Sequence, residues 1–157
     1  MTERSVEHAT FVIERTYDAS PSRVFAAWAD PAAKGRWFGS PDQGVTEFEL
    51  DFQVGGREIN RGSVEGQEYS YEARYQDIVP DERIVYAYEM HTDGSRISVS
   101  LATVQLTPEG ENTRLTYTEQ GAFLDGLDTP EQRQQGSGGI FDALGAELER
   151  QAAVGDR

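Results

Sequence analysis

Between residues 45 and 120 the chain repeats one pattern: a short run in which apolar and polar side chains alternate, followed by a turn signal. Alternation places successive side chains on opposite faces of a strand, and short turns between neighbouring runs favour hairpins. The most specific turn signal is Asp93-Gly94, a two-residue hairpin pair. The runs cover residues 45–52, 57–64, 68–79, 84–90, 97–106 and 113–120. Because hairpin-linked strands run in opposite directions, the pattern predicts an antiparallel sheet.

One more strand and two short helices are expected before this region. Residues 11–17 are rich in β-branched and aromatic side chains, which favour a strand. Ser20-Pro21 and Asp30-Pro31 each combine a capping side chain with a proline, whose missing N–H costs nothing at the first helical position. Each pair therefore predicts the start of a short helix.

The C-terminal segment has the pattern of a long helix. Residues 129–132 (Thr-Pro-Glu-Gln) resemble a capping box, and an apolar stripe at helical spacing follows. The stripe consists of Ile140, Phe141, Leu144 and Leu148. The glycine-rich stretch 136–139 leaves two alternatives: the helix begins after Gly139, or the glycines allow close packing. We favour a weak, bent first turn, because each glycine in a helix costs about 1 kcal/mol relative to alanine.

These elements predict an α+β fold in which a curved seven-stranded antiparallel sheet surrounds a long C-terminal helix, with two short helices after the first strand. No repeat or composition break divides the chain, so we expect one domain over residues 1–157 with an ordered core at about 9–150. A sheet with one apolar face must cover that face, and only the C-terminal helix is long enough to do so. One helix cannot fill the concave side of a strongly curved sheet, so we expect a cavity between the two.

Composition excludes several classes of function. Twenty-eight acidic residues oppose fourteen basic ones, and the net charge of −14 repels nucleic-acid phosphates and anionic lipid surfaces. Cysteine is absent, the two histidines (His8 and His91) are far apart, and no dinucleotide- or phosphate-binding motif occurs. We therefore expect no nucleic-acid partner, no metal and no cofactor.

The sequence also carries no signal for export or membrane insertion. Residues 1–8 lack the apolar run of a signal peptide. No stretch approaches the roughly 20 apolar residues of a spanning helix. We expect a cytoplasmic protein that does not insert into membranes.

Several short segments resemble a known family when they are taken in order. They are residues 11–15, 18–28, 36–38 (Arg-Trp-Phe), 55–57 (Gly-Gly-Arg), 75–85 and 112–116. In this order and at these spacings they resemble the family named for the activator of heat-shock protein 90 ATPase. That family is a branch of the START/birch-pollen-allergen-like superfamily, also called SRPBCC or helix-grip.

The resemblance implies a helix-grip fold and a choice of functions. The superfamily contains lipid carriers, hormone and secondary-metabolite binders, and polyketide cyclases and dehydratases. The eukaryotic co-chaperone has an additional N-terminal docking domain for which this sequence leaves no room, so we do not expect a chaperone partner. Family members often carry a Gly-Trp pair at the start of the last helix, where this chain has Gly139-Ile140. The smaller side chain either enlarges the pocket or repacks against Phe141.

Aromatic side chains on the inner faces of the strands are the first candidates for the pocket wall, because tyrosine combines an apolar ring with a hydroxyl that seeks a partner when buried. The expected ligand-binding residues are Trp28, Trp37, Phe38, Phe48, Tyr71, Tyr86, Tyr88, Ser100, Tyr117, Glu119, Ile140, Phe141 and Leu144.

A carboxylate on the same face as this wall is the first candidate for chemistry. Glu119 follows Tyr117 by two residues and should share its face, where a partly buried carboxylate could act as an acid or a base. Arg15, from the first predicted strand, is its expected partner, either in chemistry or in a structural ion pair. The candidate catalytic residues are Glu119, Tyr117 and His91.

We expect reversible binding of a small hydrophobic or aromatic molecule in the cavity between sheet and helix. Two alternatives remain open at this stage: a polyketide cyclase- or dehydratase-like enzyme, and a protein-binding module resembling a chaperone ATPase regulator. A homodimer is compatible with the sequence.

Overall fold

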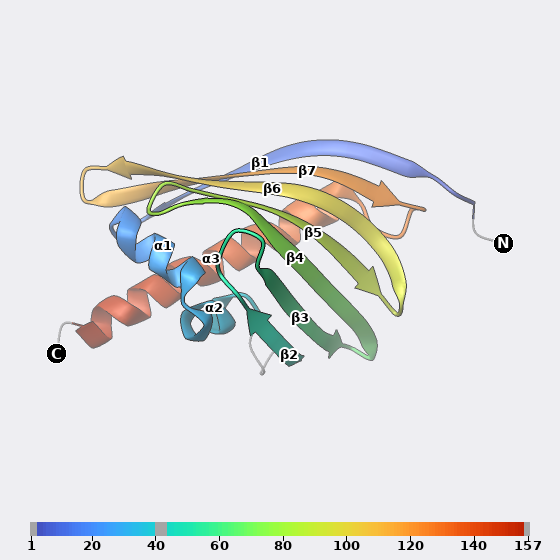
Figure 1. Ribbon diagram of the computed structural model, residues 1–157, viewed down its shortest axis with the longest axis horizontal. Coiled ribbons are helices and arrows are strands. Elements are labelled where there is room, and N and C mark those ends of the chain that lie inside the picture. Colours follow the sequence, from blue (N-terminus) through green and yellow to red (C-terminus); the bar gives the residue numbers. More distant parts are fainter. Residues whose placement is uncertain (1–2, 40–43, 156–157) are drawn as a thin grey trace.

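The computed structural model describes residues 3–39 and 44–155, which form an antiparallel sheet and three helices (Figure 1). The strands are β1 (Val6–Tyr17), β2 (Val45–Leu50), β3 (Arg57–Val64), β4 (Gln67–Val79), β5 (Arg83–Thr92), β6 (Ser95–Glu109) and β7 (Asn112–Leu124). The helices are α1 (Pro21–Ala29), α2 (Pro31–Trp37) and α3 (Pro130–Gly155). The seven-stranded sheet has the order β1-β7-β6-β5-β4-β3-β2. The α+β helix-grip architecture is therefore confirmed.

The sheet curves over α3, which crosses its concave side (Figure 1). Strands β2 to β7 follow one another as a meander, and β1 closes the order by pairing with β7. The predicted hairpin at Asp93-Gly94 joins β5 to β6, and both residues have positive φ angles (50° and 83°), as a tight two-residue turn requires.

Both predicted helix caps are present. The Ser20 hydroxyl accepts a hydrogen bond from the Arg23 amide (3.3 Å), and Asp30 accepts one from the Ala32 amide (3.3 Å). These bonds satisfy donors that the first turns of α1 and α2 would otherwise leave unpaired. The prolines that follow occupy the first helical positions.

Helix α3 begins at Pro130 and runs through the glycine-rich stretch without interruption. A start after Gly139 is therefore wrong. The Thr129 hydroxyl accepts from the Gln132 amide (3.1 Å), which is one half of the predicted capping box. Close packing accounts for one of the glycines: a Cβ atom at Gly138 would lie 3.1 Å from the Arg15 guanidinium, which donates to the Gly138 carbonyl (3.3 Å).

The first strand is longer than its apolar segment. It begins at Val6 instead of residue 11, and it pairs with β7 along its whole length, from Val6 opposite Leu124 to Tyr17 opposite Thr113. The added residues at its start are mostly exposed. Hydrogen bonding between the strands therefore continues beyond the part of β1 that packs on the core, which the hydrophobic pattern cannot indicate.

One end of the concave face is filled by aromatic side chains around Trp28. This fully buried residue of α1 has its ring centroid 4.9 Å from that of Trp37, 6.2 Å from Tyr86 and 6.1 Å from Phe141. It thereby joins α1, α2, β5 and α3 in a single packed cluster. Contacts between aromatic rings stabilise the fold beyond what the burial of their apolar area contributes.

A buried ion pair fastens α2 to the sheet within this cluster. The Lys34 ammonium lies 2.6 Å from Glu58 Oε1, both side chains are fully buried, and the Tyr75 hydroxyl donates to the same oxygen (2.7 Å). The ammonium also lies 4.8 Å from the ring centroid of Trp28 and 4.6 Å from that of Phe38. Burial lowers the pKa of Lys34, and Glu58 opposes this effect.

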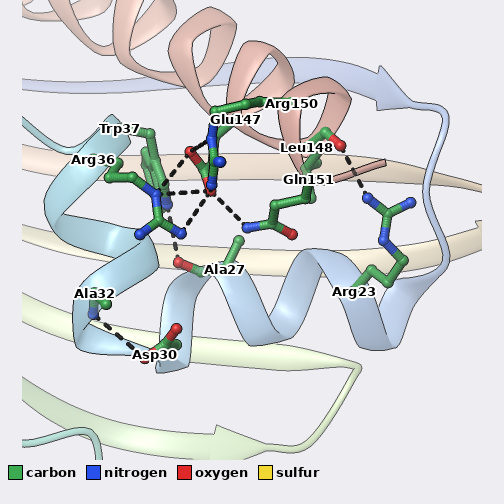
Figure 2. Close-up of polar contacts among 10 residues, drawn as sticks. All are labelled: Arg23, Ala27, Asp30, Ala32, Arg36, Trp37, Glu147, Leu148, Arg150 and Gln151. Atoms are coloured by element: carbon green, nitrogen blue, oxygen red, sulfur yellow. Dashed lines mark hydrogen bonds and ion pairs between the residues drawn. The ribbon is translucent and has the colours of Figure 1, made fainter. Parts of the chain in front are cut away.

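A second cluster fastens the C-terminal half of α3 to the short helices (Figure 2). Glu147, whose side chain is 5% exposed, accepts hydrogen bonds from Arg36 of α2 (2.9 Å), Arg150 (2.9 Å) and Gln151 (2.7 Å). Nearby, Arg23 of α1 donates to the Leu148 carbonyl (2.9 Å). Although burial opposes ionisation, the bonds from Arg150, Arg36 and Gln151 hold the pKa of Glu147 at about 2.

We predict that Glu147→Gln lowers the free energy of unfolding by about 1–2 kcal/mol at pH 7, since two of its cationic partners are half exposed and screened by solvent. The folded-state pKa of about 2 lies below the ordinary value of 4.5. The contribution is therefore present in full above pH 5 or so and is lost as the pH falls towards 2. Urea unfolding of the wild type and of Glu147→Gln between pH 7 and pH 2 measures how this difference in stability depends on pH.

The exposed Glu149, two residues further along α3, provides the matched control. Glu149→Gln should leave the urea midpoint nearly unchanged over the same range. A difference between wild type and Glu147→Gln that stays constant from pH 7 to pH 2 would contradict the assignment.

Candidate functional site

A cavity of about 540 Å³ lies between the concave face of the sheet and the N-terminal half of α3. Its size falls within the range of pockets that hold small molecules. The wall is mostly aromatic and apolar. Eight of the residues expected to bind ligand line it: Trp37, Phe38, Tyr71, Tyr86, Tyr88, Tyr117, Ile140 and Phe141.

Four of the five tyrosines that line the cavity were expected there, and they come from the inner faces of three strands, β4, β5 and β7. Tyr71 of β4 lies opposite Met90 and packs on Tyr88 of β5, with ring centroids 4.9 Å apart. Tyr86 and Tyr88 alternate along β5 with side chains of the outer face, and Tyr117 occupies the inner face of β7. All four are nearly fully buried.

The other five expected residues lie outside the wall. Trp28 and Leu144 are fully buried in the packed core beside the cavity. Phe48 of β2 lies against α2, where a Cβ atom at Gly35 would be 3.6 Å from its ring. Ser100 and Glu119 are buried and hydrogen-bonded to each other (2.7 Å), beneath the tyrosines that face the cavity.

Glu119 is the centre of a closed hydrogen-bond network. Tyr117 donates to Oε1 (2.6 Å), while Tyr88 (2.7 Å), Ser100 (2.7 Å) and Arg133 (3.3 Å) donate to Oε2. Burial is the first cause that raises the pKa values of Tyr88 and Tyr117, so both phenols stay protonated and donate at neutral pH. Both carboxylate oxygens are thus occupied.

Arg133 of α3 completes this network, and sequence reasoning missed it. Besides Glu119, it donates to the Tyr88 hydroxyl (2.8 Å), to Ser98 (2.7 Å) and to Asp128 (2.8 Å). Burial acts against its charge, but Tyr88, Glu119 and Asp128 raise the pKa of Arg133 above its ordinary value. Helical spacing offered a signal, because Arg133 lies seven residues before Ile140 and so shares its face.

The expected pairing of Arg15 with Glu119 is wrong. Arg15 donates to Asp142 (2.8 Å) and to the Gly138 carbonyl on α3. In the register of β1 and β7, Glu119 lies opposite Phe11, four residues along the strand from Arg15. That offset is about 13 Å, beyond the reach of a guanidinium.

The three candidate catalytic residues are not brought together. Tyr117 and Glu119 are hydrogen-bonded, but His91 lies with Glu89 and Arg61 in a separate polar depression on the outer face of the sheet. Its Nε2 is 3.8 Å from Glu89 Oε1. Strand alternation explains this, because His91 follows the inward-facing Met90 by one residue.

Within residues 3–39 and 44–155, no three histidine, cysteine or acidic side chains are grouped so that they could hold a metal ion. Over the same ranges, no helix combines the length and apolar character needed to cross a membrane.

Comparison with known proteins places this architecture among solved relatives. The family model described as Activator of Hsp90 ATPase homolog 1-like protein matches residues 18–149. The Mll3558 protein from Rhizobium loti is 53% identical, with a TM-score of 0.86 over 91% of this chain and 99% of that one. A putative uncharacterized protein from Rhizobium leguminosarum is 45% identical, with a TM-score of 0.90 over 95% and 99% of the two chains.

A more distant likeness shows the fold alone. CalU16 from Micromonospora echinospora is 21% identical, with a TM-score of 0.60 over 98% of this chain and 89% of that one. A search among curated proteins found no match.

We predict that Arg133→Met lowers the free energy of unfolding by about 3–5 kcal/mol, because it leaves the buried carboxylate of Glu119 without its cation. Adding Glu119→Gln should restore part of the loss, so that the double variant is more stable than the sum of the single changes implies. Urea unfolding of the four proteins at pH 7 measures the coupling.

The half-exposed pair of Arg15 and Asp142 provides the control, with side chains 33% and 69% exposed. Arg15→Met should cost no more than about 1 kcal/mol. Additive effects of Arg133→Met and Glu119→Gln would contradict the closed network.

Proposed function

The chain belongs to the Activator of Hsp90 ATPase homolog 1-like family, and we propose that it binds a small hydrophobic or aromatic molecule reversibly in the cavity beneath its sheet. The observation that carries this proposal is the wall: about 540 Å³ of space lined mainly by aromatic rings and by Ile140 of α3. Displacing water from such a surface favours an apolar guest.

The aromatic rings of the cavity wall also favour a particular shape of ligand. Phe38, Tyr71 and Tyr88 follow one another at centroid separations of 5.0 and 4.9 Å. Flat molecules can stack on such rings or contact them edge to face, and these contacts favour binding beyond the effect of burying apolar surface. A planar aromatic ligand therefore fits this wall better than a flexible chain of the same size.

The polar groups beneath the wall support binding over catalysis. Glu119 accepts from four donors, and the pKa values of Tyr88 and Tyr117 are raised by burial. The two phenols therefore stay protonated near pH 7, and both oxygens of the Glu119 carboxylate already accept hydrogen bonds. The network instead anchors α3 to the sheet and keeps the cavity open. A cyclase- or dehydratase-like activity would require a free acid or base in contact with the ligand.

Native mass spectrometry of freshly purified protein, followed by denaturation, tests for a retained molecule. Isothermal titration calorimetry with 2-acetonaphthone, a flat neutral aromatic ketone, tests for binding to the ligand-free protein. We expect a retained small molecule or saturable 1:1 binding. Absence of both would contradict the proposal.

We further predict that Ile140→Trp weakens binding of 2-acetonaphthone about tenfold or more, because the larger indole fills space on the cavity side of α3. The free energy of unfolding should change little, since the added rings occupy a cavity instead of a packed core. Calorimetric titration and urea unfolding give the two quantities.

Val99→Trp is the matched control, because Val99 lies on the outer face of β6 and its side chain is 43% exposed. It adds the same side chain far from the cavity and should leave the affinity unchanged. Equal affinities of Ile140→Trp and the wild type would place the binding site elsewhere.

A further inference from the structure

One polar atom of the cavity wall is buried without a partner. The Tyr71 hydroxyl has no hydrogen-bond partner among the residues that the structure describes, and the residue is only 5% exposed. Tyr71 lines the cavity, and its ring is held between Phe38 (5.0 Å) and Tyr88 (4.9 Å). An unpaired buried hydroxyl costs free energy, so its presence calls for a partner that is not part of the chain.

The neighbouring polar groups are occupied. The Tyr69 hydroxyl donates to Asn60 Oδ1 (3.0 Å), and Asn60 Nδ2 donates to the Phe38 carbonyl (2.9 Å). The Tyr88 hydroxyl donates to Glu119. Tyr71 therefore differs from the tyrosines on either side of it, although all three belong to the same wall.

The charged side chains around the cavity disfavour an anionic ligand. Arg133 lines the cavity, but its guanidinium is shared by two carboxylates, those of Glu119 and Asp128. A ligand carboxylate would therefore meet an excess of negative charge. Burial also raises the pKa of Tyr71 well above 10, so its hydroxyl is a neutral donor at physiological pH.

Charge selects against a cationic ligand as well. The Lys34 ammonium lies 4.6 Å from the ring centroid of Phe38 and 5.8 Å from that of Tyr86. Both rings line the cavity, so a ligand cation stacked on them would lie close to this ammonium. The nearby carboxylates of Glu58, Glu119 and Asp128 are already paired with Lys34 or Arg133. The site favours a molecule without net charge.

We propose that the ligand is a neutral aromatic or alicyclic molecule with one hydrogen-bond-accepting oxygen, a carbonyl, ether or hydroxyl, to which the Tyr71 hydroxyl donates. This inference rests on the proposed function of the cavity. It adds the charge class of the ligand and the residue that orients it.

Calorimetric titration with three probes of one ring system tests the inference: naphthalene, 2-acetonaphthone and 2-naphthoate. We expect the wild type to bind 2-acetonaphthone about five- to tenfold more tightly than naphthalene, the gain of one neutral hydrogen bond. The carboxylate, 2-naphthoate, should bind most weakly. Tyr71→Phe should bind 2-acetonaphthone and naphthalene about equally tightly, with the affinity for naphthalene retained.

Tyr69→Phe is the matched control, since Tyr69 also lines the cavity but its hydroxyl already has a partner. This variant should keep the preference for the ketone. Urea unfolding without ligand adds a second readout: Tyr71→Phe should be at least as stable as the wild type, because it removes a buried hydroxyl that has no partner.

The outcomes separate the two proposals. Equal binding of naphthalene and 2-acetonaphthone, tightest binding of 2-naphthoate, or a clear loss of stability in Tyr71→Phe would overturn this inference and leave the binding function standing. Failure of all three probes to bind would overturn this inference, and it would overturn the binding function as well if native mass spectrometry also finds no retained molecule.

Discussion

A single helix cannot cover the concave face of a curved seven-stranded sheet, and most features of this molecule follow from that geometric constraint. At one end of the face, α1 and α2 supply the missing cover, and their aromatic side chains pack around Trp28. At the other end, α3 is the only helix among the described residues that crosses the sheet (Figure 1), and the space left over is the cavity. The same fold thus has a solid half and a hollow half.

The hollow half needs its own means of holding α3 away from the sheet. The Arg133 network serves that purpose: it connects the first turns of α3 to β5, β6 and β7 through buried charge-assisted hydrogen bonds. In the solid half, the buried carboxylate of Glu147 and the half-exposed arginines around it attach α3 to the short helices. Between these two attachments the helix passes the cavity, where small residues such as Gly136 and Gly139 leave the space open.

Alternation along the strands predicted the sheet and the inward direction of Tyr71, Tyr86, Tyr88 and Tyr117, while capping signals and helical spacing predicted the helices. It could not identify which polar side chains would be buried together. Lys34 and Glu58 are 24 positions apart in sequence, and their contact depends on how α2 docks on β3. The partner of Glu119 was misassigned for the same reason, since strand register and the reach of α3 decide whether Arg15 or Arg133 arrives there. Local patterns specify faces, whereas ion pairs between distant elements depend on the assembled structure.

Lys34 is the only lysine of the chain, and its ammonium is completely buried beneath α2. In the folded protein a reagent that acylates primary amines therefore has no lysine on the surface to attack. Acylation of Lys34 requires that α2 detach from the sheet, so the rate of its modification measures how often this part of the domain opens. The chain thus carries a natural chemical reporter of its own local unfolding, positioned next to the cavity wall.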